Sequence, residues 1–174
     1  MPFTIAGLNE AIAAAIPERE AIVTATRRLT WRELQLRTRR LAHVIYDAGL
    51  GCHREREALA PWESGQDHIA LYLYNGHEYL EGMLGAYKAR TVPFNVNYRY
   101  VDEELLYLFR DAGSLGIIYH AIFAPLLARI LPQLPEIPLL LQVDDGSGET
   151  LLPGARDYEE ALAAASDTTL AVTP

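Results

Sequence analysis

Residues 68–95 read HIALYLYNGHEYLEGMLGAYKARTVPFN, and this stretch decides the fold. Its first seven residues form a nearly unbroken apolar run, which is typical of a strand that is covered on both faces. A helical pattern follows, and TVPFN at 91–95 reads as a second short strand. A strand, a helix and a strand in this order indicate a parallel pair joined by a right-handed crossover.

The rest of the chain continues this alternation. Further strands are expected in 20–31, 115–120 and 137–143, and further helices in 1–16, 30–48, 102–113, 123–131 and 157–165. We therefore predict one α/β domain, with a largely parallel sheet flanked by helices. Pro93 places the second strand of the opening unit at an edge or a strand end, because proline cannot donate a ladder hydrogen bond.

The helix after Thr30 has the clearest boundaries. TWRE has the spacing of a capping box, with Thr30 at the N-cap and Glu33 at the third position. Gly49 supplies the stop. Steps of three and four residues place six side chains on one face, namely Trp31, Leu34, Thr38, Leu41, Ile45 and Ala48.

The arginines of this helix, Arg32, Arg37, Arg39 and Arg40, fall mostly off that face. We interpret them as a solvated surface rather than a site for phosphate or a lipid headgroup.

The helix within the opening stretch is expected to begin at Asn75, with Glu78 at the third position. Its predicted buried stripe consists of Leu80, Met83, Leu84 and Tyr87. The small residues Gly82, Gly85 and Ala86 would let it lie close on a sheet.

Residues 51–67, GCHREREALAPWESGQD, show no clean period and are long for a loop in a compact domain. They are either a functional flap or an insertion with Trp62 pinned to the surface. Cys52 and His53 are adjacent, and neighbouring side chains seldom aim at each other, so a nucleophile and base pair is not favoured.

Composition excludes several classes of function. The 174 residues include 15 basic and 23 acidic ones, for a net charge of −8, which argues against nucleic acid as a partner. A single cysteine fits a reducing cytoplasm, and no apolar run is long enough to cross a membrane. We predict a cytoplasmic protein and leave open a peripheral membrane contact through the arginine surface.

The expected carboxyl ends of the strands carry no complete catalytic set. No G-x-G-x-x-G or G-x-x-x-x-G-K-[ST] loop follows a strand, and the five histidines lack metal-ligand spacing. We interpret DDGSG at 144–148 as a plain turn. His120 ends a strand and is interpreted as a hydrogen-bonded edge residue rather than a group that faces a cleft.

Two motifs carry a family resemblance. LTWREL at 29–34 and YKARTVPFN at 87–95, with the strands and helices between and after them, resemble the adenylate-forming enzymes, and most of all the acyl-CoA synthetases. This implies the N-terminal part of the family's large domain. It also implies that the whole enzyme, of which this chain would be the N-terminal part, uses ATP and Mg²⁺ to convert a carboxylate into an acyl-adenylate. The thiol of CoA then attacks this intermediate.

The chain departs from the family pattern at several points. Arg90 stands where the family has a glycine that permits a left-handed turn, and the link at 51–67 is longer than usual. The phosphate loop and the C-terminal domain do not occur in 1–174. The chain therefore looks like a single N-terminal subdomain, an incomplete fold. We predict that alone it has no ligase activity, binds no cofactor and self-associates through uncovered edges.

The resemblance also suggests where substrate or CoA would pass. The candidates lie where the strand at 91–95 meets the carboxyl rim of the sheet, and they are Asn95, Asn97, Tyr98, Arg99 and Tyr100. The alternative interpretation makes the asparagines turn formers, the tyrosines packing residues and Arg99 a surface charge. Two other functions stay open: a stand-alone α/β module that binds a nucleotide or acyl group, and a non-catalytic interaction domain.

Overall fold

The computed structural model describes residues 4–25 and 27–171, and within them it confirms the α/β class. Five parallel strands form one sheet in the order β4-β3-β5-β6-β7. Their bounds are β3 His68–Tyr72, β4 Val92–Asn95, β5 Ser114–His120, β6 Leu139–Val143 and β7 Arg156–Asp157. Pro93 lies in the edge strand β4, as the sequence predicts.

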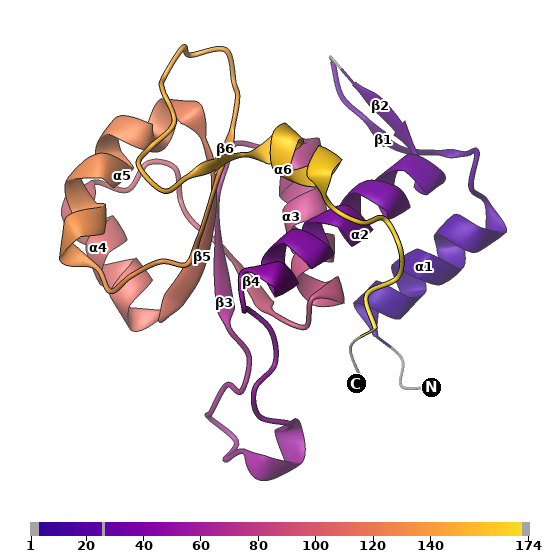
Figure 1. Ribbon diagram of the computed structural model, residues 1–174, viewed down its shortest axis with the longest axis horizontal. Helices are drawn as coiled ribbons and strands as arrows, with labels where there is room; N and C mark the ends of the chain where they lie inside the picture. The colour runs from indigo at the N-terminus through magenta and orange to yellow at the C-terminus, as the bar shows by residue number, and fades with distance from the viewer. Residues whose placement is uncertain (1–3, 26, 172–174) are drawn as a thin grey trace.

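Helices cover both faces of the sheet (Figure 1). One layer holds α2 Trp31–Asp47, α3 His77–Lys88 and α6 Tyr158–Ala164, and α1 Ile5–Ala15 packs on its outside. The other holds α4 Asp102–Asp111 and α5 Ala124–Ile130. The hairpin of β1 Glu20–Val23 and β2 Arg28–Thr30 precedes α2, and short 3₁₀ turns occupy Arg56–Ala58, Ala121–Phe123 and Leu131–Gln133.

The start of α2 is the predicted capping box. The Thr30 hydroxyl accepts the Glu33 amide at 3.2 Å, and the Glu33 carboxylate accepts the Thr30 amide at 2.7 Å. Gly49 follows the helix with a φ of 81°. The predicted face is buried in its centre, where Leu41 and Ile45 lie in the larger of the two cores of the sheet.

The prediction for α3 was wrong in two respects. Gly76, not Asn75, is the N-cap, and no side chain caps the helix. Leu80 is 45% exposed, because α3 turns its small residues inward instead. Gly82 faces Leu71 of β3, and Gly85 lies against Leu41 of α2 so closely that a Cβ there would be 2.7 Å from the Leu41 Cγ. Close packing of backbones, rather than a stripe of large side chains, buries this helix.

The prediction that the α2 arginines form a solvated surface was also wrong for Arg37 and Arg39. Arg37 Nε donates to Glu81 of α3 at 2.6 Å, and its Nη2 donates to Glu159 of α6 at 2.6 Å. Glu81 is 0% exposed and also accepts the Tyr158 hydroxyl at 2.7 Å. Burial, together with the Glu81 charge, raises the pKa of Tyr158, so this hydroxyl keeps the proton that it donates. These contacts join α2, α3 and α6.

Arg90 adopts the left-handed conformation that its place in the chain requires, with a φ of 60°. An arginine can occupy this region at a cost that glycine does not incur. Its guanidinium donates to both Glu55 oxygens, at 2.8 and 2.6 Å, and its carbonyl accepts the Gln66 side chain at 2.7 Å. The turn into β4 is thus kept despite the missing glycine.

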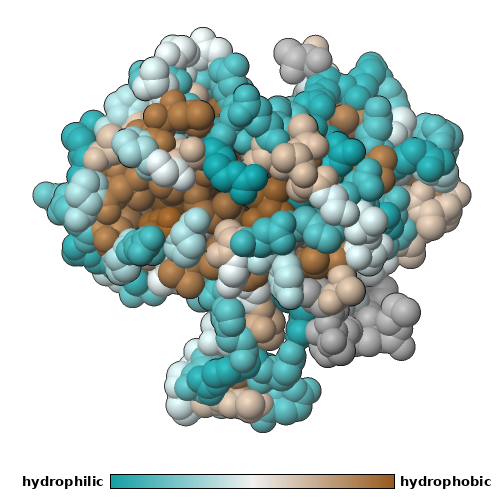
Figure 2. Space-filling view, viewed as in Figure 1, coloured by the Kyte–Doolittle hydropathy of each residue, from teal (hydrophilic) through white to brown (hydrophobic). Residues whose placement is uncertain are grey.

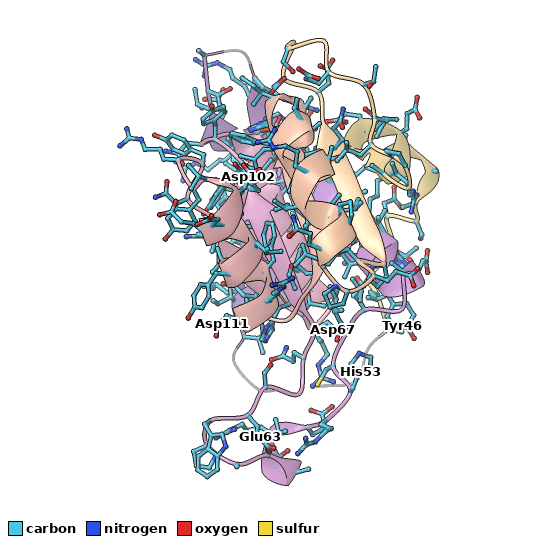
Figure 3. The ribbon with its side chains drawn as sticks, turned by 90° about the vertical axis from the view of Figure 1, so that its left-hand side faces the viewer. Tyr46, His53, Glu63, Asp67, Asp102 and Asp111 are labelled. Atoms are coloured by element: carbon cyan, nitrogen blue, oxygen red, sulfur yellow. The ribbon has the colours of Figure 1, made fainter. Side chains whose placement is uncertain are left out.

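Residues 51–67, here called the arm, project from the body beside the amino end of the sheet (Figures 1 and 3). The two sides of the arm pair at its base through Cys52 and Gln66, and Glu63 lies near its far end (Figure 3). His53 Nε2 contacts Asp67 Oδ2 at 2.6 Å. Trp62 is 85% exposed, so its ring is not packed against the surface of the protein body as the second interpretation expected.

The sheet has an open edge at β7. Among the residues that the structure describes, this two-residue strand pairs only with Leu141 and Gln142 of β6. Apolar surface is visible to the left of centre in Figure 2, over the region of α5 and β6. Leu134, Ile137 and Leu152 are among the partly buried apolar side chains packed on the core on this side. The predicted self-association stays a prediction.

Candidate functional site

The carboxyl rim of the sheet holds the five candidate residues in a short turn after β4. Asn95 ends the strand, and the Asn97 side chain accepts the Arg99 amide at 3.0 Å while its carbonyl accepts the Tyr100 amide at 3.1 Å. Asn97 is therefore a turn former, as the alternative interpretation has it. The turn leaves Tyr98 and Arg99 exposed and Tyr100 half-buried. This rim is at the end of the sheet where α4 begins, at Asp102 in Figure 3, and the arm is at the other end.

Tyr74 connects this turn to the neighbouring strand ends. Its ring meets Tyr98 edge-on at 4.9 Å between centroids, and it also contacts Phe123 at 5.0 Å and His120 at 5.7 Å. The Arg99 guanidinium lies 5.5 Å from the centre of the Tyr98 ring, within the range of a cation–π contact. The rim thus carries a group of aromatic rings, part buried and part open to solvent, with one cation on its outer side.

His120 lies at the end of the central strand β5 and is buried. Its Nδ1 accepts the backbone amide of Tyr74 at 2.9 Å, so the neutral ring carries its proton on Nε2. Burial lowers the pKa of His120, and the carboxylates of Glu78 and Asp145 oppose this only in part. The prediction of a hydrogen-bonded residue is confirmed, although β5 is not an edge strand.

His77, in the first turn of α3, has a different environment. Arg27 Nη1 lies 2.8 Å from its Nε2, and because an arginine only donates, this nitrogen accepts. The proton of the neutral ring is then on Nδ1, 3.2 Å from a Glu78 oxygen. Both nitrogens of the ring are therefore in use, which indicates a positioned structural histidine rather than a free base.

This arrangement is suited to binding more than to chemistry. The rim offers aromatic faces for stacking, a guanidinium and polar groups of a turn, whereas covalent catalysis needs a nucleophile held against a base. Among residues 4–25 and 27–171, no group of three His, Cys, Asp or Glu side chains is placed to hold a metal ion. Within the same residues, no helix is both long enough and apolar enough to span a bilayer.

The sequence places Tyr74 at the carboxyl end of a strand but does not single it out as a candidate, and Phe123 was missed as a member of the rim. Tyr74 follows β3, and Phe123 lies in the turn after β5. They meet only because β3 pairs with both β4 and β5. The carboxyl ends of parallel strands lie at the same edge of a sheet. This rule, applied to the residues that follow each strand, could have identified both side chains.

Comparison with known proteins identifies the family to which this chain belongs. Residues 9–172 match the sequence profile of the family described as AMP-binding enzyme. The chain belongs to the AMP-binding enzyme family. The match covers both motifs that carry the family resemblance, 29–34 and 87–95.

Several of the proteins that this chain resembles in sequence are named as CoA ligases. The chain is 54% identical over 164 residues to the medium-chain acyl-CoA ligase Mig of Mycobacterium avium. The aligned region covers 94% of this chain and 30% of that protein. It is 32% identical over 167 residues to a 3-oxocholest-4-en-26-oate–CoA ligase of Rhodococcus rhodochrous, covering 95% of this chain and 28% of that one. The chain thus spans about 30% of the length of these relatives.

Solved structures confirm the fold. The anthranilate CoA ligase AuaEII, in complex with anthranoyl-AMP, matches with a TM-score of 0.81 at 17% identity, covering 97% of this chain and 30% of that chain. The N-terminal domain of FACL13 from Mycobacterium tuberculosis matches with a TM-score of 0.76 at 22% identity, covering 98% and 38%. At these identities the likeness establishes the architecture and no more.

Proposed function

We propose that this chain is part of an acyl-CoA ligase that activates a medium-chain carboxylic acid. The observation that carries the proposal is the 54% identity to a medium-chain acyl-CoA ligase over 94% of the chain. In the proposed reaction, the carboxylate attacks the α-phosphorus of ATP, pyrophosphate leaves, and the CoA thiolate then displaces AMP from the acyl-adenylate. A cytoplasmic location stays a prediction.

Residues 1–174 do not supply the groups that would bind the ATP phosphates and Mg²⁺ in this reaction. The sequence has no glycine-rich loop with a lysine to hold the phosphates. Within the described ranges no acidic or histidine cluster fits Mg²⁺. No residue of this chain is therefore assigned a chemical role in either step of the proposed reaction. The proposed role of this chain is to build the sheet, its helical layers and the rim.

The first expected result concerns activity. The 174-residue chain should show no ATP–pyrophosphate exchange above background with octanoate, because it supplies neither a phosphate loop nor a positioned lysine. A protein that extends this chain to the length of its relatives should catalyse the exchange. Isotope exchange on both preparations, with the longer protein at equal concentration, checks this. Exchange by the purified short chain would contradict its proposed role as a scaffold, and none by the long protein would contradict the proposed ligase.

The second expected result concerns the rim. We infer that Asn95, Asn97, Tyr98, Arg99 and Tyr100 border the path of substrate or CoA in the whole ligase. Tyr98→Ala and Arg99→Ala should then raise KM for the acid or for CoA by about threefold or more while kcat changes little, which is the pattern of lost binding. Tyr107→Ala is the matched control, since Tyr107 is 69% exposed on α4 outside the rim. Unchanged KM values would favour the packing interpretation.

A further inference from the structure

A cavity lies away from the rim, among the helices α1, α2 and α3 on one face of the sheet. It has a volume of about 360 Å³ and opens between the first turn of α1, the second half of α2, the end of α3 and residues 169–170. Figure 1 shows the yellow segment after α6 passing beside α2 toward α1. The apolar residues around the cavity are Ile5, Ala6, Ala42, Tyr87 and Leu170. Its volume is within the range of small-molecule sites.

Charged groups gather at one side of this cavity. Arg39 Nη2 donates to Glu10 at 2.5 Å, and the Lys88 ammonium donates to the same carboxylate and to the Thr38 hydroxyl. Burial raises the pKa of Glu10, but hydrogen bonds from Arg39 and Lys88 outweigh this and the net shift is downward, so the carboxylate stays ionised. Two cations face one anion, and the cluster keeps a net charge of +1.

The start of α1 adds to this positive potential. Thr4 caps the helix by accepting the Gly7 amide at 3.0 Å, and Thr4 to Gly7 all border the cavity. The first turn contains no acidic residue. The partial positive charge of the helix N-terminus is therefore not offset by a carboxylate on its own first turn.

We propose that this cavity binds an unbranched aliphatic carboxylate, with its carboxylate between Arg39, Lys88 and the start of α1 and its chain along the apolar wall. The combination on which this rests is an apolar cavity with a cationic side, which suits a ligand with one anionic end. The site is separate from the proposed reaction: Lys88 ends α3, at the amino end of β4, whereas the rim lies at the carboxyl end of that strand.

Titration of the 174-residue chain with butyrate, hexanoate and octanoate, without ATP or CoA, tests the proposal. Nuclear magnetic resonance shifts should change for amides around the cavity, such as those of Ala6, Ala42 and Leu170. Affinity should rise by about fourfold for each added CH₂ until the cavity is full. Octan-1-ol, which has no charge, should bind about tenfold more weakly than octanoate. Equal affinity for the two, or shifts away from the cavity, would overturn the proposal.

Two variants locate the site. Arg39→Gln removes a cation and should weaken octanoate binding by about tenfold, whereas Arg32→Gln, on the same helix but outside the cavity, should leave it unchanged. Ala6→Trp fills the cavity from a half-buried position and should abolish binding without a loss of melting temperature. Octanoate binding to folded Ala6→Trp with unchanged affinity would exclude this cavity. Failure here leaves the proposed ligase reaction untouched, because that is measured on the longer protein.

Discussion

Arg37→Ala should lower the free energy of unfolding by about 3–5 kcal/mol, the cost of leaving a buried charge without its partner. Glu81 is 0% exposed, and Arg37 is the cation that forms a salt bridge with it. The Tyr158 hydroxyl remains as a donor to Glu81, but it carries no charge to balance the carboxylate. The variant also removes both hydrogen bonds from α2 to Glu159, which loosens the attachment of α6 to α2 and leaves Glu159 with Arg27.

Urea denaturation followed by far-ultraviolet circular dichroism measures this loss. Arg32→Ala is the matched control, because Arg32 is on the same helix and pairs with Glu18 where both side chains are more than half exposed. Such a pair is worth about 1 kcal/mol or less. A triple variant, Arg37→Met with Glu81→Leu and Tyr158→Phe, removes the charges together and should recover most of the stability. Equal losses for Arg37→Ala and Arg32→Ala would refute the buried-charge argument.

Gly85→Ala should destabilise the chain by about 1–3 kcal/mol, although alanine favours helix more than glycine does. The new Cβ would lie 2.7 Å from both Cγ and Cδ2 of Leu41 and 2.9 Å from its Cβ, so α2 and α3 must separate. Leu41→Ala alone should cost about 2–5 kcal/mol, because Leu41 is fully buried. The double variant exchanges a small and a large side chain across one contact, and it should cost less than the sum of the two.

Gly82→Ala provides the comparison on the same helix. A Cβ at Gly82 would meet the end of the Leu71 side chain at 2.7 Å, and that methyl group can move more readily than the Leu41 Cβ. We expect the loss at Gly82 to be the smaller of the two in the same urea experiment. Strict additivity of Gly85→Ala and Leu41→Ala would show that the two residues do not share the contact.

Sequence reasoning succeeded where the cause is local. The capping box at Thr30 and the glycine stop at Gly49 depend on residues a few positions apart, and both are present. The apolar run at 68–74 also identified β3, since a strand covered on both faces admits few polar residues. Local patterns thus gave the class of the fold and most element positions.

Predictions failed where the partner lies far along the chain. Arg37 is 44 residues from Glu81 and 122 from Glu159, so its spacing on α2 could not reveal burial. Leu80 was expected inside but is exposed, and although the small residues of α3 were expected to pack closely on the sheet, the contact of Gly85 with Leu41 of another helix was not foreseen. The candidate turn 95–100 was found from its place after a strand, but Tyr74 and Phe123 join it only through the order of the strands.

The exposure of Trp62 on the arm has a consequence for spectroscopy. The chain has two tryptophans, and Trp62 is already in water when the protein is folded. Its emission should change little on unfolding. Trp31 packs against the small cluster of Ile22, Leu29 and Leu34, beside the β1–β2 hairpin. A fluorescence melt of this chain should therefore report the release of that hairpin from α2, and it should say little about the five-stranded sheet.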